Sequence, residues 1–165
     1  MNRLWLIVAA IVVFVLFFRM AKSKLAYLHP EIRKRWEEAS RRYKVQYPDE
    51  PQPFITHTFR SSTEQQKLFD QGRTGPGSIV TNAQPGQSLH NYDPTHAFDI
   101  AFRKTDGSLD WDVRLFENFA RIAKQLGLAW GGDWTNFKDR PHFEAPNYSW
   151  RLAQSGVDPT YPNYT

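Results

Sequence analysis

The chain has 165 residues, a formal net charge of +4, six Trp, seven Tyr, twelve Phe and no Cys. This length fits one domain with an aromatic core, and the lack of Cys excludes a thiolate metal site. Residues 1–50 carry 10 Lys and Arg against 5 Asp and Glu, whereas residues 51–165 carry 11 against 12. Because the basic excess lies in the N-terminal part, the rest of the chain is not expected to present a basic face to nucleic acid.

An apolar run from Leu4 to Phe18 opens the chain and contains no charged residue. At about 1.5 Å per residue it spans roughly 22 Å, and flanking arginines that snorkel extend its reach toward a ~30 Å bilayer core. A cleaved signal peptide is the alternative. The candidate cleavage sites ending at Ala21 and Ala26 each place a cation where a small residue is required. We therefore expect residues 1–24 to be an uncleaved signal anchor that spans the membrane once.

The next segments predict two helices and one strand. Glu31 to Tyr47 has apolar residues at helical spacing, and Pro30 suits a helix start. Pro53 to Phe59 reads as a strand. Ser61-Ser62-Thr63-Glu64 is a capping box that begins a helix ending near Asp70. We interpret residues 25–50 as a basic juxtamembrane helix that leads into a domain over residues 51–165.

The second half of the chain predicts a loop, a strand and one strongly amphipathic helix. Residues 72–85 contain several Gly and Pro and indicate a loop. Residues 96–102 alternate like a strand and end before a turn at Asp106-Gly107. Asp110 or Asp112 caps a helix that ends at Leu126, with Val113 counted on its apolar face. The expected fold is α+β, with helices packed on a small antiparallel sheet.

Two clusters of polar residues offer the ligands of a metal site. Ser88-Leu89-His90-Asn91 is followed by Ala97-Phe98-Asp99, and the stretch WGGDWTNFKDRPHFE contains Asp139 three residues before His142. The two clusters supply two histidines, one aspartate and a further carboxylate. A catalytic zinc site has this inventory: three protein ligands, an open fourth position and a general base.

The strings SLHN…AFDI and WGGDW…DRPHFE resemble the motifs of the M15 zinc peptidases. This family includes phage L-alanyl-D-glutamate endolysins and the D-alanyl-D-alanine peptidases of the VanY and VanX type. Further matching strings are FRS at residues 59–61, EQQ at 64–66 and QGRT at 71–74, so the resemblance runs from about residue 54 to residue 144. It implies that His90, Asp99 and His142 bind Zn²⁺ and that Asp139 is the general base.

Several neighbouring residues compete for these roles. Many relatives have a shorter connection between the first two ligands, and the longer one here makes His96 a rival of His90, although the motif favours His90. Asp133 stands too far from His142 in sequence to act as the base and is assigned to shaping the loop or contacting substrate. His57 is interpreted as structural.

Two more residues are candidates for binding substrate. Arg60 polarises the scissile carbonyl or binds a substrate carboxylate, as a guanidinium does well, and its alternative is a surface cation. Trp134 and Trp130 are candidates for lining a groove, with core packing expected for at least one of them.

The expected function is that of a zinc endopeptidase that hydrolyses the L-Ala–D-Glu bond of peptidoglycan stem peptides. It would serve cell-wall opening, lysis or protein release, with a functional link to a holin or spanin and no role in nucleic-acid binding. The alternatives are a D,D-carboxypeptidase of the same fold, an inactive peptidoglycan-binding module and a lysis-regulating membrane protein. Three cations, Arg19, Lys22 and Lys24, favour a cytoplasmic domain by the positive-inside rule. The substrate lies outside the inner membrane, so we expect the domain to face the periplasm.

Overall fold

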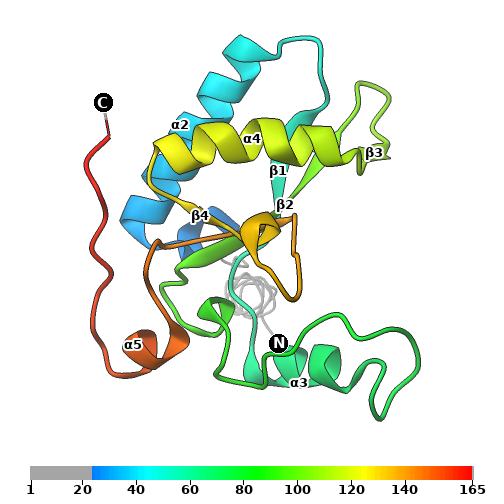
Figure 1. Ribbon diagram of the computed structural model, residues 1–165, viewed down its shortest axis with the longest axis vertical. Coiled ribbons are helices and arrows are strands. Elements are labelled where there is room, and N and C mark those ends of the chain that lie inside the picture. Colours follow the sequence, from blue (N-terminus) through cyan, green and yellow to red (C-terminus); the bar gives the residue numbers. More distant parts are fainter. Residues whose placement is uncertain (1–23, 165) are drawn as a thin grey trace, which may run out of the picture.

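A five-stranded antiparallel sheet forms the centre of the structure, a computed structural model that describes residues 24–164 (Figure 1). Its main path runs β1 (Gln52–His57), β2 (Ala97–Arg103), β5 (His142–Glu144) and β4 (Ala129–Trp130), and β3 (Leu109–Asp110) pairs with β2. Every pairing is antiparallel. The predicted α+β class with a small antiparallel sheet is therefore confirmed.

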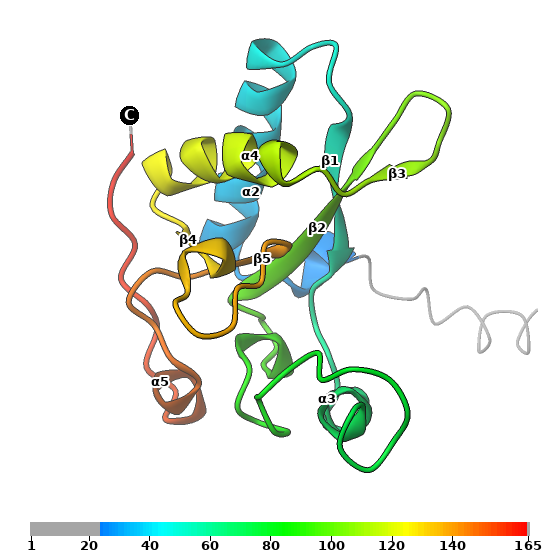
Figure 2. The same cartoon turned by 45° about the vertical axis from the view of Figure 1, so that its right-hand side comes forward.

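Two long helices, α2 (Pro30–Gln46) and α4 (Val113–Gln125), cover one face of the sheet, and two short ones lie beyond its opposite end (Figures 1 and 2). The short helices are α3 (Ser62–Asp70) and α5 (Trp150–Gln154). Three single turns of 3₁₀ helix complete the secondary structure: η1 (Lys24–Tyr27), η2 (Leu89–Asn91) and η3 (Gly131–Asp133). Residues 72–85 form a loop without a helix or named strand, as predicted.

The helix boundaries follow from the capping residues in the sequence. The predicted capping box is present at the start of α3, where the Ser61 hydroxyl and the Glu64 carboxylate each accept a backbone N–H. Asp112 caps α4 by accepting the N–H of Arg114. The expectation for Val113 is wrong: its side chain is exposed, because it lies in the first turn of α4, outside the buried stripe of the helix.

The core lies between the sheet and the two long helices. From β2, Phe98 contacts Trp36 of α2 with 5.4 Å between ring centroids, and Phe102 contacts Phe116 of α4 at 5.0 Å. Phe143 of β5 stacks on Phe98 at 5.5 Å. Each such side chain contributes about 1.5–3 kcal/mol when it is fully buried. These contacts fix the positions of β2 and β5 relative to the two helices. The two strands carry Asp99 and His142, two of the three candidate ligands.

Residues near the end of the described chain fasten onto α2 through Arg35. Only 2% of the Arg35 surface is exposed, and its guanidinium donates to the carbonyl of Pro162 at 2.6 Å and to Glu31 at 2.7 Å. The rings of Tyr161 and Tyr164 lie 4.7 and 4.8 Å from the guanidinium carbon. Helix α2 is therefore packed on two sides, by the sheet and by this terminal segment.

The predicted membrane anchor, apart from Lys24, lies outside the described residues. Within residues 24–164, no helix combines the length and the apolar character needed to cross a bilayer.

Candidate active site

Three polar side chains lie in one row across the sheet. Asp99 stands at the middle of β2, opposite His142 of β5 on one side and His57 of β1 on the other. Directly opposite residues of paired strands hold their side chains on the same face, about 5 Å apart. The register of the sheet therefore brings the aspartate and His142, which are 43 residues apart in sequence, to one point.

His90 reaches the same point from the short turn η2. The Ser88 hydroxyl accepts the N–H of His90 at 3.3 Å and so helps to orient this turn. The Arg60 N–H donates to the His90 carbonyl at 2.8 Å, and the Asn91 amide donates to the Arg60 carbonyl at 2.9 Å. The last two of these hydrogen bonds hold the turn against the segment that follows β1.

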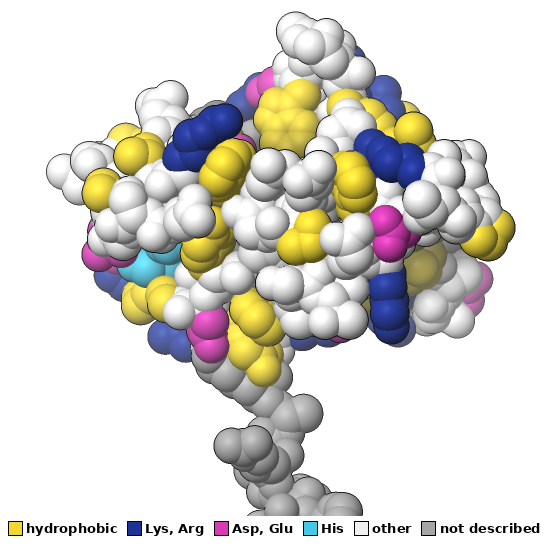
Figure 3. All heavy atoms as spheres, turned by 90° about the horizontal axis from the view of Figure 1, so that it is seen from below, with side chains coloured by type: hydrophobic (Ala, Val, Ile, Leu, Met, Phe, Trp, Pro, Cys, Tyr) yellow, Lys and Arg dark blue, Asp and Glu magenta, His cyan; other side chains and the backbone are white. Residues whose placement is uncertain are grey.

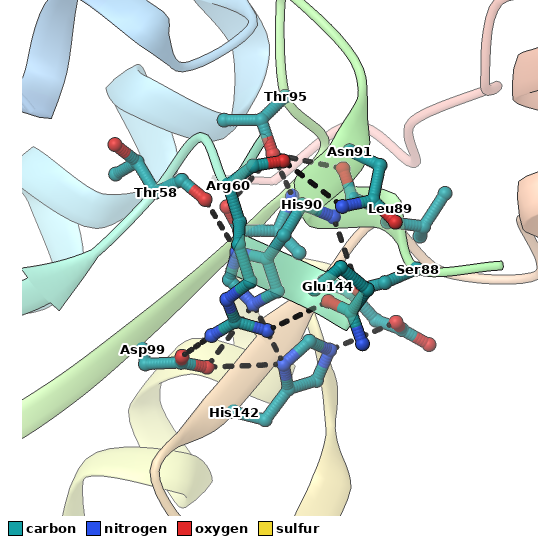
Figure 4. Close-up of polar contacts among 12 residues, drawn as sticks. Thr58, Arg60, Ser88, Leu89, His90, Asn91, Thr95, Asp99, His142 and Glu144 are labelled. Atoms are coloured by element: carbon teal, nitrogen blue, oxygen red, sulfur yellow. Dashed lines mark hydrogen bonds and ion pairs between the residues drawn. The ribbon is translucent and has the colours of Figure 1, made fainter. Parts of the chain in front are cut away.

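The facing atoms of the three side chains nearly touch (Figure 4). His90 Nε2 lies 3.2 Å from Asp99 Oδ1 and 3.2 Å from His142 Nδ1, and the latter lies 3.1 Å from Asp99 Oδ1. Both imidazoles are buried, and the Asp99 side chain is 14% exposed. Two imidazole nitrogens and one carboxylate oxygen that converge in this way form a donor set that fits a metal ion.

The outer nitrogen of each imidazole is held by a hydrogen-bond acceptor. His90 Nδ1 donates to the Thr58 carbonyl at 2.5 Å, and His142 Nε2 donates to Glu144 Oε2 at 2.9 Å (Figure 4). When both rings are neutral, this tautomer turns the lone pair of each inner nitrogen toward the cluster, as a metal ligand requires. When the inner nitrogens are protonated instead, they donate to Asp99. Sequence reasoning missed the role of Glu144, although a strand residue two positions after a ligand lies on the same face.

The charges of the cluster reinforce one another. Burial alone would raise the pKa of Asp99, but the nearby His90 and hydrogen bonds from both histidines hold it well below its usual range. Burial would lower the pKa of His142, yet its hydrogen bonds to Asp99 and Glu144 raise it to about 10. The structure therefore concentrates negative charge on both sides of His142, which favours a bound cation.

Arg60 lies against the cluster and is itself held in place. Its guanidinium is 3.3 Å from Asp99 Oδ2, and it donates to the side-chain oxygen of Gln65 at 3.2 Å. Gln65 is fully buried and donates to the Ala83 carbonyl at 2.8 Å. The surface-cation alternative for Arg60 is wrong, because only 15% of its side chain is exposed and both ends of its guanidinium are bonded. Sequence reasoning assigned no role to Gln65.

Asp139 lies beside the cluster in the loop between η3 and β5. Its N–H donates to the Gly131 carbonyl at 3.0 Å, and its own carbonyl accepts the His142 N–H at 3.2 Å. A Cβ at Gly131 would lie 2.5 Å from the Asp139 carbonyl oxygen, so this close approach requires glycine. Burial raises the pKa of the Asp139 carboxyl above its ordinary value. A half-buried carboxylate with a raised pKa is suited to accept and return a proton.

The cluster lies in a cleft of about 830 Å³ that Arg60 and Asp139 also line. Trp134 lines it too, with its ring 5.1 Å from that of His142. His57 also lies in the cleft wall and is exposed, which the structural interpretation of this residue did not anticipate.

The face that carries α3 and α5 is largely uncharged near its centre and has scattered hydrophobic side chains (Figure 3).

Other candidates lie away from the cluster. His96 is buried in a separate aromatic group, 3.3 Å from the Tyr161 hydroxyl and 4.9 Å from the Tyr148 ring centroid. Asp133 points to the surface, where it pairs with Lys124 at 2.9 Å, and it is not among the residues that line the cleft. Trp130 is buried in the core, as expected for one of the two tryptophans.

Comparison with known proteins shows which family the segment that carries the candidate ligands resembles. Residues 81–145 match an M15 peptidase family model described as D-alanyl-D-alanine carboxypeptidase. The peptidoglycan L-alanyl-D-glutamate endopeptidase CwlK of Bacillus subtilis (strain 168) is 48% identical over 99 residues, a match that covers 54% of this chain and 58% of CwlK. The chain thus spans less than two thirds of that relative. The resemblance to the M15 peptidases is confirmed over the segment that carries the candidate ligands.

Two solved structures share the fold at lower identity. The L-Ala D-Glu endopeptidase ChiX of Serratia marcescens aligns with a TM-score of 0.55 and 19% identity, covering 84% of this chain and 92% of ChiX. A mutant of the vancomycin resistance D,D-pentapeptidase VanY, solved in complex with Zn(II), aligns with a TM-score of 0.52 and 15% identity, covering 79% of this chain and 80% of VanY.

Proposed function

We propose that this chain is a zinc-dependent endopeptidase that hydrolyses the L-Ala–D-Glu bond of peptidoglycan stem peptides. The observation that carries the proposal is the convergence of His90, Asp99 and His142 in a cleft, with both imidazoles oriented by outer hydrogen bonds. The 48% identity to CwlK, an L-alanyl-D-glutamate endopeptidase, supports the choice of bond.

The donor set fits zinc better than the other common divalent ions. Magnesium and calcium prefer all-oxygen sites, whereas two imidazoles and one carboxylate that leave a fourth position open suit catalytic zinc. Bound zinc supplies a Lewis acid that activates water and polarises a carbonyl. The structural neighbour VanY was solved with Zn(II), which supports the same ion here.

Three residues near the candidate ligands have different roles in the proposed hydrolysis. Asp139 takes the proton of the attacking water and, once protonated, returns it to the leaving amine of D-Glu, so the amide bond breaks without a covalent intermediate. Arg60 lies beside Asp99 with its guanidinium fixed by Gln65, where it is placed to stabilise negative charge on the substrate. Trp134 packs beside His142 and forms part of the cleft wall next to the candidate ligands.

The mechanism depends on the position of Asp139, which Gly131 controls. Gly131→Ala is expected to displace the Asp139 loop and to lower turnover on the order of 10²-fold, the scale of a 1 Å misplacement. Gly75→Ala is the matched control, because a Cβ there meets its nearest atom at an ordinary 3.6 Å. Initial rates and zinc content of both variants test this. A Gly131→Ala protein as fast as the control would show that the loop tolerates the displacement.

Digestion of purified sacculi, with and without a chelator, tests the function. Mass spectrometry of the products should reveal new N-terminal D-Glu, and the chelator should abolish it. Release of D-alanine alone would instead establish the D,D-carboxypeptidase alternative, which the description of the family model favours. Binding to sacculi without any product would establish the inactive wall-binding module.

We further propose that residues 1–24 anchor the enzyme in the inner membrane with the domain in the periplasm. The apolar run Leu4–Phe18 and the location of the substrate support this topology, and a link to a holin or spanin would place the enzyme in cell lysis. Protease added to sealed spheroplasts is expected to digest the domain. The intact mass of the extracted protein should correspond to a chain that begins at residue 1 or 2. A protected domain would mean a cytoplasmic enzyme, and a new N-terminus near Ser23 would mean a cleaved signal.

A further inference from the structure

Trp111 presents an exposed indole on the wall of the cleft. Its side chain is 56% exposed although it lines the same cleft as the His–Asp–His cluster. One face of the ring is stacked on Phe116, with centroids 6.1 Å apart and planes 16° apart. An indole that is fixed from behind and open to water on the wall of this cleft offers a flat platform on which a ligand can stack.

The two other tryptophans in the cleft wall have their rings engaged by protein neighbours. Trp134 packs at 5.1 Å from the ring of His142. Trp150 carries the guanidinium of Arg151 above its ring at 4.4 Å. Trp111 also has one ring neighbour, Phe116, but at 56% it is more exposed than Trp134 at 38% and the partly buried Trp150. It is therefore the tryptophan of this wall that offers the most surface to a ligand.

The corner that carries Trp111 joins β3 to α4 and is held by local hydrogen bonds (Figure 2). Asp110 accepts the N–H of Asp112 at 3.0 Å, and Asp112 accepts the N–H of Arg114 at 3.0 Å. Both carboxylates are paired with cations, Asp110 with Lys104 at 3.5 Å and Asp112 with Arg114 at 3.7 Å, so the charges at this corner favour neither an anionic nor a cationic ligand. They are compatible with a neutral ligand that has an apolar face and hydroxyl groups at its edge, as a pyranose ring has.

The separation between the His–Asp–His cluster and this corner is comparable to the length of the substrate units that lie between the scissile carbonyl and the sugar. Asp110 pairs with Phe102, three residues along β2 from Asp99, which is about 10 Å at ~3.3 Å per residue. In peptidoglycan, one L-alanine and one lactyl ether separate the L-Ala carbonyl from the sugar ring. These two units extend over roughly 7 Å at ~3.6 Å each. An indole side chain projecting from this corner can therefore meet the sugar while the carbonyl is at the cluster.

We propose that Trp111 is a sugar-binding subsite that stacks on the lactyl-substituted, N-acetylated pyranose ring of the glycan strand. The inference rests on the proposed L-Ala–D-Glu activity. Axial C–H groups of the pyranose pack on the indole face, so the subsite makes the enzyme prefer stem peptides that are attached to sugar over free peptides. It deepens the proposed function by assigning the recognition of the wall polymer to a residue outside the metal cluster.

Two matched substrates test the proposal: a muramyl peptide, and the same peptide without its sugar. The measured quantity is the ratio of kcat/KM for the first to that for the second. Trp111→Ala should lower this ratio on the order of ten-fold, the scale of one lost aromatic contact, and Trp111→Phe should restore part of it. Val45→Ala is the control, since Val45 is 72% exposed on α2 and does not line the cleft; its ratio should equal that of the unsubstituted protein.

A binding measurement separates this proposal from the proposed activity. Full-length protein stripped of metal should co-sediment with purified sacculi, and Trp111→Ala should weaken that binding. An unchanged ratio, or equal losses on both substrates, would overturn the sugar subsite. Failure of the unsubstituted enzyme to cleave either peptide would refute the proposed activity instead, and co-sedimentation would still report on the indole.

Discussion

Replacing His142 or His90 by alanine is expected to remove most of the zinc from the purified protein and to abolish hydrolysis of sacculi. Each substitution deletes one of the three converging donors, and a site with two remaining ligands holds zinc far more weakly. Metal analysis by mass spectrometry of the dialysed, folded protein gives the stoichiometry, which should be one ion per chain before substitution.

Two other histidines provide controls for metal content. His57→Ala removes a histidine from the same cleft that is not part of the converging set, and His96→Ala removes the rival from its separate aromatic group. Both proteins should retain zinc. Retention in His90→Ala combined with loss in His96→Ala would reverse the choice of ligand.

Asp139→Asn is expected to fold and keep its zinc while hydrolysing sacculi at least ~10²-fold more slowly, the usual scale for a lost general base. The amide has nearly the same shape as the carboxylate, so it preserves the loop and removes only the group that accepts the proton. Initial rates, zinc content and the circular dichroism spectrum of the same preparation separate loss of the base from misfolding.

Asp133→Asn is the matched control for this substitution, because it makes the same chemical change within the same stretch of chain. Asp133 is an exposed partner of Lys124, and exposed ion pairs contribute about 0–1 kcal/mol. Its activity should therefore fall much less than that of Asp139→Asn. The opposite ranking would show that the base had been assigned to the wrong aspartate.

The sequence predicted best those features that depend on neighbouring residues. The capping box at Ser61 and the Asp112 cap are set by local hydrogen bonds, and both are present. Strand β2 also forms where the sequence predicted one, although its residues are buried at nearly every position rather than alternately. The convergence of His90, Asp99 and His142 was anticipated through the M15 resemblance. Spacing along the chain does not show that these residues meet.

The partners of these residues were harder to predict, because they depend on tertiary packing. Gln65 became significant only when the fold brought Ala83 to one end of its amide and Arg60 to the other. The sequence predicted a structural role for His57, because strand alternation does not reveal which face of the sheet borders a cleft. The prediction that Val113 is buried was wrong for a similar reason, because helical spacing does not tell whether the sheet extends as far as the first turn of the helix.

The position of Asp99 on β2, between Phe98 and Phe102, ties the integrity of the site to that of the core. Strand side chains alternate between faces, so a slip of one residue would turn the carboxylate toward the helices and both phenylalanines toward water. Trp36 and Phe116 hold those phenylalanines on the helix side. The core therefore selects the correct register of β2, because any register shift that misplaced the carboxylate would also remove both phenylalanines from the core.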